Sequence, residues 1–176
     1  MKKQTSLVLE NPMRKIKMEK IVLSCGAIGQ DLEKSKKLIE FLTKKKAQII
    51  KSGPKRRIPA FGVKPGMELG VRVTIRGEFA KETLKRLLGA VDNTIKAKQV
   101  MSNTFSFGIK EYIEIPGIEY QREIGIRGLS VTVVFIRPGV RVKRRKIKSA
   151  GLPARQYASR EEIITFMKEN FKTEIE

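Results

Sequence analysis

Two stretches of this chain, 51–67 and 137–160, contain fourteen Lys or Arg residues between them and no Asp or Glu. Like charges without counter-charges repel one another and cannot be buried, so both stretches need a polyanion as partner. Nucleic acid fits that requirement, because closely spaced cations neutralise phosphates and release their counterions. The chemistry that these residues predict is phosphate binding.

The first stretch combines five cations with one aromatic residue and repeated Gly and Pro. Phe61 could stack on a nucleobase or anchor the loop in the core, and anchoring is favoured. A solvated charged loop is the alternative interpretation of the whole stretch. The candidate contacts to RNA are Lys51, Lys55, Arg56, Arg57 and Lys64.

The second stretch begins with seven cations in the twelve residues 137–148. Alone it is expected to be disordered and to order against phosphates, so binding would depend strongly on salt and little on base sequence. We interpret 137–160 as an extended basic strap. Its candidate contacts to RNA are Arg137, Arg141, Lys143, Arg144, Arg145, Lys146 and Lys148.

Few residues are suited to catalysis or metal binding. The chain has no His, which excludes catalytic triads and the common zinc sites, and its one Cys, Cys25, is expected to be a small buried residue at a strand end. The turn 26–29 could present amides to a phosphate, but a plain turn is favoured. No metal or other cofactor is predicted. The glutamates at 111, 114, 119 and 123 are expected to be solvated or paired with Arg122 and Arg127.

Hydrophobic periodicity predicts strands and helices around the basic stretches. Strict alternation over 69–76 is typical of a half-buried strand with one apolar face and one face that carries arginines. Apolar residues every three or four positions from 78 to 95 indicate a helix, and Ser159 with Glu162 has the spacing of a capping box. The other expected elements are strands at 16–25, 48–51 and 129–136, strands or hairpin arms at 105–110 and 112–115, and helices at 31–45 and 160–171.

This order favours an α+β fold, with a mainly antiparallel sheet, helices packed on one face and long basic loops. A length of 176 residues favours a single domain, expected over 11–176 after a flexible arm at 1–10. The apolar run near the N-terminus is too short for a signal sequence or a membrane span. The chain is therefore interpreted as soluble and intracellular.

Six short motifs give the chain a family resemblance over 11–171. It resembles the universal large-subunit ribosomal protein five family, the 5S rRNA binders, in its archaeal and eukaryotic branch. Each motif alone is weak, and together they are specific. The motifs are Asn11-Pro12-Met13-Arg14, the segment 52–62 that ends in Ala60-Phe61-Gly62, Val73-Thr74-Ile75-Arg76-Gly77, Phe105-Ser106-Phe107-Gly108-Ile109-Lys110-Glu111, Ile124-Gly125-Ile126-Arg127-Gly128-Leu129 and Arg137-Pro138-Gly139.

The resemblance implies a structural, non-enzymatic protein of the cytoplasmic ribosome, which helps attach 5S rRNA in the central protuberance and touches large-subunit rRNA. It implies that 51–66 lies near peptidyl-site tRNA and that another part contacts a small-subunit protein across an intersubunit bridge. Neighbouring large-subunit proteins would be further partners, and no membrane contact is implied.

The resemblance also implies RNA-facing roles for Ser24, Thr74 and Arg76. Ser24 stands where relatives usually have Asn, so its hydroxyl can reach one acceptor but lacks the bidentate amide. Two other function classes remain as alternatives: an extraribosomal RNA- or protein-binding adaptor, and an RNA-processing enzyme that uses a carboxylate or Lys.

Overall fold

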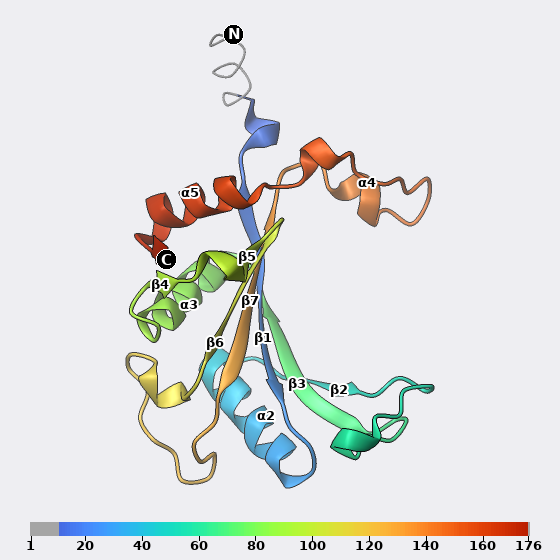
Figure 1. Cartoon of the computed structure of the whole chain (residues 1–176), viewed down its shortest axis with the longest axis vertical. Helices are drawn as coiled ribbons and strands as arrows, with labels where there is room; N and C mark the ends of the chain where they lie inside the picture. The colour runs from blue at the N-terminus through green and yellow to red at the C-terminus, as the bar shows by residue number, and fades with distance from the viewer. Residues whose placement is uncertain (1–10, 176) are drawn as a thin grey trace. The chain divides into compact units, whose positions relative to one another are not determined.

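The structure is a computed structural model that describes residues 11–175 (Figure 1). The predicted flexible arm, 1–10, lies outside the described residues. The described chain consists of two compact units. The loop unit comprises 21–92 and 107–132, and the strap unit comprises 11–20, 93–106 and 133–175. A single domain over 11–176 stays a prediction.

Six strands form one sheet in the order β2-β3-β1-β7-β6-β5. The pairs β1/β3, β2/β3 and β5/β6 are antiparallel. This sheet, combined with helices, confirms the predicted α+β class. The strands are β1 (Lys17–Gly26), β2 (Gln48–Lys51), β3 (Glu68–Ile75), β5 (Val100–Met101), β6 (Thr104–Ile109) and β7 (Leu129–Ile136).

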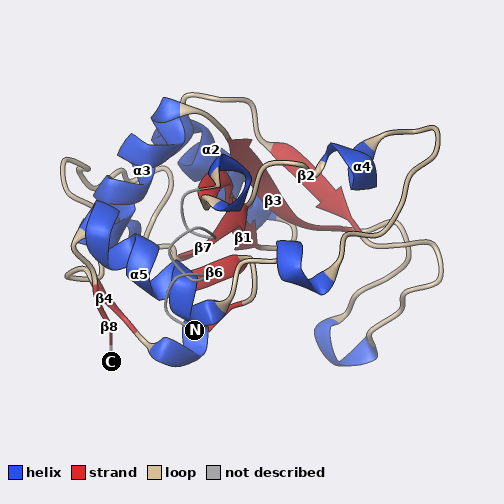
Figure 2. Ribbon diagram, turned by 90° about the horizontal axis from the view of Figure 1, so that it is seen from above, coloured by secondary structure: helices blue, strands red, loops and turns tan. Residues whose placement is uncertain are grey.

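In the loop unit, strand alternation places apolar side chains on one face of β1 and β3. Helix α2 (Gln30–Thr43) packs against β3 (Figure 2), and α3 (Glu78–Gly89) also buries an apolar stripe. Burial of these faces removes apolar surface from water and is the main favourable contribution to folding. The buried residues are Ile21, Leu23 and Cys25 in β1, Val71, Val73 and Ile75 in β3, Leu32, Leu38 and Ile39 in α2, and Ala80, Leu84, Leu87 and Leu88 in α3.

Both helices of the loop unit end before their predicted limits. Helix α2 ends at Thr43 because Lys44 adopts a left-handed conformation, with φ of 51°. The prediction that the next helix continues to Ile95 is wrong, since α3 ends at Gly89. Asp92 and Asn93 have positive φ, which interrupts the helical backbone that the apolar spacing suggested.

The predicted strand or hairpin arm at 112–115 is also wrong. Residues Tyr112–Glu114 form a 3₁₀ turn, η4, and the buried Tyr112 hydroxyl accepts a hydrogen bond from the Gln121 amide at 2.9 Å. The glutamates at 111, 114, 119 and 123 are exposed, in line with the expectation that they are solvated, but no ion pair among the described residues joins them to Arg122 or Arg127. Glu123 pairs with Lys37, whereas Arg127 pairs with Asp31. Burial of Tyr112 and the hydrogen bond to its hydroxyl therefore outweigh the local strand preference of this segment.

The strap unit is built around the end of β7 and helix α5 (Arg160–Phe171). The predicted capping box is confirmed, because Ser159 and Glu162 each accept a hydrogen bond from the other's backbone amide. Phe135 and Phe166 pack edge to face with ring centroids 5.5 Å apart, which joins α5 to β7. The short strands β4 (Thr94–Ile95) and β8 (Glu174–Ile175) pair in parallel.

The remaining elements are single turns. Helix α4 (Arg141–Arg144) and η5 (Ala154–Gln156) lie within 137–160, where an extended strap was predicted. The other 3₁₀ turns are η1 (Pro12–Arg14), η2 (Pro59–Phe61) and η3 (Ala97–Gln99). No helix in the described part of the chain is long and apolar enough to cross a membrane.

Candidate nucleic-acid interface

The sheet face opposite the apolar core carries the three polar residues singled out from the sequence. The register of β1 with β3 sets Ser24 opposite Arg72 and Val22 opposite Thr74. Leu23 and Val73, the intervening residues of β1 and β3, are buried in the core. Successive side chains of a strand point to opposite faces, so those of the two pairs point to the other face of the sheet. Arg76 follows β3 with the same parity and is exposed. The structure therefore gathers Ser24, Thr74 and Arg76 on one open face.

Arg72 belongs to this face although it was not among the candidate contacts. Its Nε donates to Gln48 Oε1 at 3.2 Å, and the residue is exposed. The signal that could have identified it is the period-two alternation of β3, which places Arg72, Thr74 and Arg76 on the same side. The face thus offers two guanidinium groups, each able to bind a phosphate through two hydrogen bonds.

A shallow concavity of about 310 Å³ lies beside Ser24, lined by 24–26, 108–110 and 128–130. Gly128 is required for its shape, because a Cβ there would lie 2.6 Å from the Lys110 carbonyl oxygen. Ser130 and Lys110 add an exposed hydroxyl and an exposed ammonium group. Hydroxyl and ammonium donors of this kind suit the sugars and phosphates of RNA.

Cys25 lines this concavity and is buried. Its Sγ donates to the Gly128 carbonyl oxygen at 3.4 Å. Burial raises the pKa of the Cys25 thiol to about 11, and the nearby Arg127 charge opposes the shift only in part. The thiol therefore stays protonated at neutral pH. The burial of Cys25 confirms the prediction of a small buried residue at a strand end.

The loop 52–67 connects β2 and β3 (Figures 1 and 2) and is held by hydrogen bonds of its own backbone. The Ser52 amide donates to the Met67 carbonyl at 2.7 Å and closes the base of the loop. Lys51, at the end of β2, pairs with Glu68 at 3.4 Å between exposed side chains. The other four candidate cations are exposed and form no ion pair with a described residue: Lys55, Arg56, Arg57 and Lys64.

The prediction that Phe61 anchors this loop in the core is wrong. Phe61 is 74% exposed, whereas Val63 is only 5% exposed and occupies the buried position. Gly62 takes a left-handed conformation with φ of 63°, so the chain reverses between the two residues. The loop is anchored by the smaller side chain and presents the aromatic ring to solvent.

Arg137 begins the basic strap as a buried residue, 5% exposed. Its guanidinium donates to both carboxylate oxygens of Glu162 and, at 2.6 Å, to the Arg155 carbonyl oxygen. These partners occupy the two terminal nitrogens, so the geometry favours a positioning role for Arg137 over direct contact with RNA.

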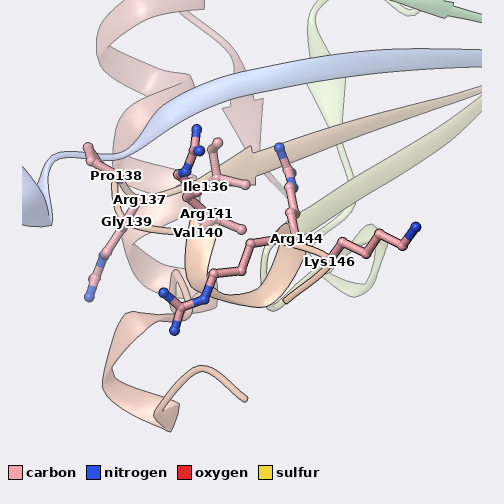
Figure 3. Close-up of a pocket in the computed structure, with 9 residues that line it drawn as sticks. Ile136, Arg137, Pro138, Gly139, Val140, Arg141, Arg144 and Lys146 are labelled. Carbon is pink, nitrogen blue, oxygen red and sulfur yellow. The ribbon is translucent and has the colours of Figure 1, made fainter. Parts of the chain in front are cut away.

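The other strap cations lie on the surface, and all residues from 141 to 150 are exposed. Arg144 pairs with Glu19, and the Lys143 ammonium lies 5.9 Å from the centre of the Tyr157 ring. The Arg145 Nε donates to the Lys148 carbonyl at 2.6 Å. A pocket of about 620 Å³, lined by 136–141 and 144–146, lies among these cations (Figure 3). A cationic pocket of this kind suits phosphate groups.

Comparison with known proteins identifies the family. The family model for the C-terminus of the ribosomal L5 proteins matches residues 68–156. Large ribosomal subunit protein uL5 of Nanoarchaeum equitans is 42% identical, over 95% of this chain and 99% of its own length. The chain belongs to the uL5 family. The Sulfurisphaera tokodaii protein of the same name is 42% identical over 94% of both chains, and that of Methanococcoides burtonii is 36% identical over 96% and 100%.

Membership in the uL5 family confirms the resemblance found in the sequence, and with it the prediction of a ribosomal protein that is not an enzyme. The segment matched by the family model includes Thr74, Arg76 and the strap cations. Ser24 and the β2–β3 loop precede that segment and fall within the longer similarity to the uL5 relatives. Among the described residues, no group of three or more Cys, Asp or Glu side chains is arranged to hold a metal ion.

Proposed function

We propose that this chain is a structural protein of the large ribosomal subunit that binds 5S rRNA through the open face of its sheet. The observation that carries the proposal is the placement of Ser24, Thr74 and Arg76 on one face, opposite the core and beside a concavity with polar walls. Hydroxyl and guanidinium donors on neighbouring strands can follow an RNA backbone, because strand spacing sets them a few ångströms apart.

The strap is a second RNA contact, directed at large-subunit rRNA. Its exposed cations Arg141, Lys146 and Lys148 supply phosphate contacts, and Lys143, Arg144 and Arg145 add charge while also holding the strap. Arg137 sets the direction in which the strap leaves β7. Two separate RNA surfaces allow one small protein to connect 5S rRNA to its surroundings in the central protuberance.

The β2–β3 loop lies near tRNA in the peptidyl site, with Lys55, Arg56, Arg57 and Lys64 as its contacts. The support is the loop's acid-free charge together with the family resemblance. Lys51 contributes less, because it already has a carboxylate neighbour. The protein also contacts a small-subunit protein across an intersubunit bridge and adjoins other large-subunit proteins.

Binding of the chain to 5S rRNA tests the main proposal. Thr74→Val and Arg76→Ala are each expected to weaken binding, by roughly 5-fold or more for the charged group. Ser24→Asn is expected to strengthen binding and Ser24→Ala to weaken it, since the amide group has two donors, the hydroxyl has one and the Ala side chain has none. Arg86→Ala is the matched control, because Arg86 is an exposed arginine of α3 and its replacement removes the same single positive charge.

The outcomes separate specific contact from general charge. A loss of affinity for Arg76→Ala that exceeds the loss for Arg86→Ala supports the open face as the binding surface. Equal losses would mean that only net charge matters, and would contradict the proposal for this face.

A further inference from the structure

The turn at the tip of the β2–β3 loop holds an aromatic side chain in solvent. Residues Pro59–Phe61 form η2, and the Ile58 and Val63 backbones on either side exchange two hydrogen bonds of 3.1 and 3.0 Å. The Phe61 amide donates to the Ile58 carbonyl at 3.3 Å, and the Gly62 amide donates to the Pro59 carbonyl at 3.0 Å. Phe61 is therefore exposed within a hydrogen-bonded turn.

Several features restrict the motion of this turn. Pro59 fixes its own φ at the start of the turn, and Gly62 supplies the left-handed residue that ends it. Val63 is buried and ties the turn to the core. A ring held in this way loses little conformational freedom when a ligand covers it, so more of the contact energy appears as affinity.

The surroundings of Phe61 identify the kind of ligand. Residues 51–67 contain five cations and no carboxylate, and four of those cations lack an ion-pair partner among the described residues. A planar apolar ring in a loop that also carries cations matches a nucleobase with its attached phosphate. Ile58, 40% exposed, widens the apolar surface at the tip.

We propose that Phe61 stacks on an unpaired nucleobase of an RNA bound by the β2–β3 loop. The inference rests on the proposed RNA-binding function and adds a base contact to a loop otherwise expected to contact phosphates alone. The loop then recognises a place in an RNA where a base is unstacked, in addition to negative charge. The base can come from tRNA or from rRNA, and the experiment separates these sources.

Cross-linking in assembled ribosomes identifies the occupant. A benzophenone side chain replaces Phe61 in one sample and Tyr120 in another, in ribosomes that carry tRNA in the peptidyl site. Tyr120 is the matched control, because it is an exposed aromatic residue, 54% exposed, outside both basic stretches. We expect cross-links from position 61 to RNA, and the labelled molecule shows whether that RNA is tRNA or rRNA.

Stacking itself is tested by affinity and fluorescence. The RNA that cross-links to position 61 is expected to bind the Phe61→Ala variant roughly 5- to 150-fold more weakly, with an unchanged salt slope, since no charge is lost. Phe61→Tyr is expected to retain binding. The chain has no Trp, so the Phe61→Trp variant carries a single indole, whose emission is expected to fall when that RNA binds. Tyr120→Trp is expected to show no such change.

Three results would overturn the inference. Cross-links from position 61 only to protein would assign the tip to a protein partner. Equal RNA affinity of wild type and Phe61→Ala would show that Phe61 makes no stacking contact. An unquenched Phe61→Trp variant that still binds RNA would do the same. In each case 5S rRNA binding by the sheet face can persist, so the proposed function stands or falls separately.

Discussion

Glu162 joins two structural elements, because its carboxylate both caps helix α5 and pairs with the buried Arg137 guanidinium. Arg137 is the first residue after β7, and its Nη1 also donates to the Arg155 carbonyl. One ion pair therefore fixes the beginning of the basic strap against the helix that follows it. A strap held at both ends loses less entropy when it binds RNA than a free segment would.

Glu162→Ala is expected to lower the free energy of unfolding by about 2 kcal/mol, since it leaves a buried Arg137 charge unpaired and removes one half of the capping box. Glu161→Ala is the matched control, because it removes the same charge from the first turn of α5 without touching Arg137. Urea denaturation measures both. A similar loss for the two variants would show that the Arg137 pair contributes nothing beyond the helix dipole.

Glu19→Ala is expected to loosen the strap. The Glu19 side chain is only 10% exposed and pairs with Arg144 in α4. Without it, trypsin should cleave within 141–148 severalfold faster in the native protein, because cleavage follows the population of locally open chain. Glu33→Ala is the control, and cleavage rates that match between the two variants would contradict a docked strap.

Binding to 5S rRNA is expected to weaken steeply between low and moderate salt. Simultaneous replacement of Arg141, Lys146 and Lys148 by Ala should reduce the slope of log affinity against log salt for large-subunit rRNA by about 2 to 3, because three phosphate contacts of the strap are lost. Filter binding over a series of salt concentrations measures the slope. A 5S rRNA affinity that does not change with salt would contradict the electrostatic account, and an unchanged slope of the triple variant for large-subunit rRNA would contradict the proposed strap contact.

Cys25 is expected to make stability depend on pH in alkaline solution. Its pKa is about 11 when folded, above the ordinary value of 9.0, so the unfolded chain loses the thiol proton first. The protonated thiol's contribution to the free energy of unfolding is fully present below pH 9. Roughly 2 kcal/mol of it is lost as pH rises toward 11. Denaturation of wild type and Cys25→Ala at several pH values isolates this effect from the titration of Lys and Tyr. Parallel curves for the two proteins would contradict it.

Local signals predicted the elements whose order depends on near neighbours. The β-branched run 129–136 coincides with β7, and the Ser159 and Glu162 spacing coincides with the capped start of α5. The alternation of β3 also predicted a sheet face that carries arginines. These patterns succeed because strand alternation and helix capping involve residues only two to four positions apart.

The basic composition of 51–67 and 137–160, the α+β class and the family were evident from the sequence by itself. The end of α3, the exposure of Phe61 and the burial of Arg137 were decided by tertiary structure. Ile95 continues the helical spacing but pairs in β4 with β8, and Val63 takes the buried site expected for Phe61. Arg137 and Glu162 meet across 25 positions. Sequence spacing does not tell which of several candidate side chains is buried or which distant groups come into contact. Both are decided by close packing in the folded chain.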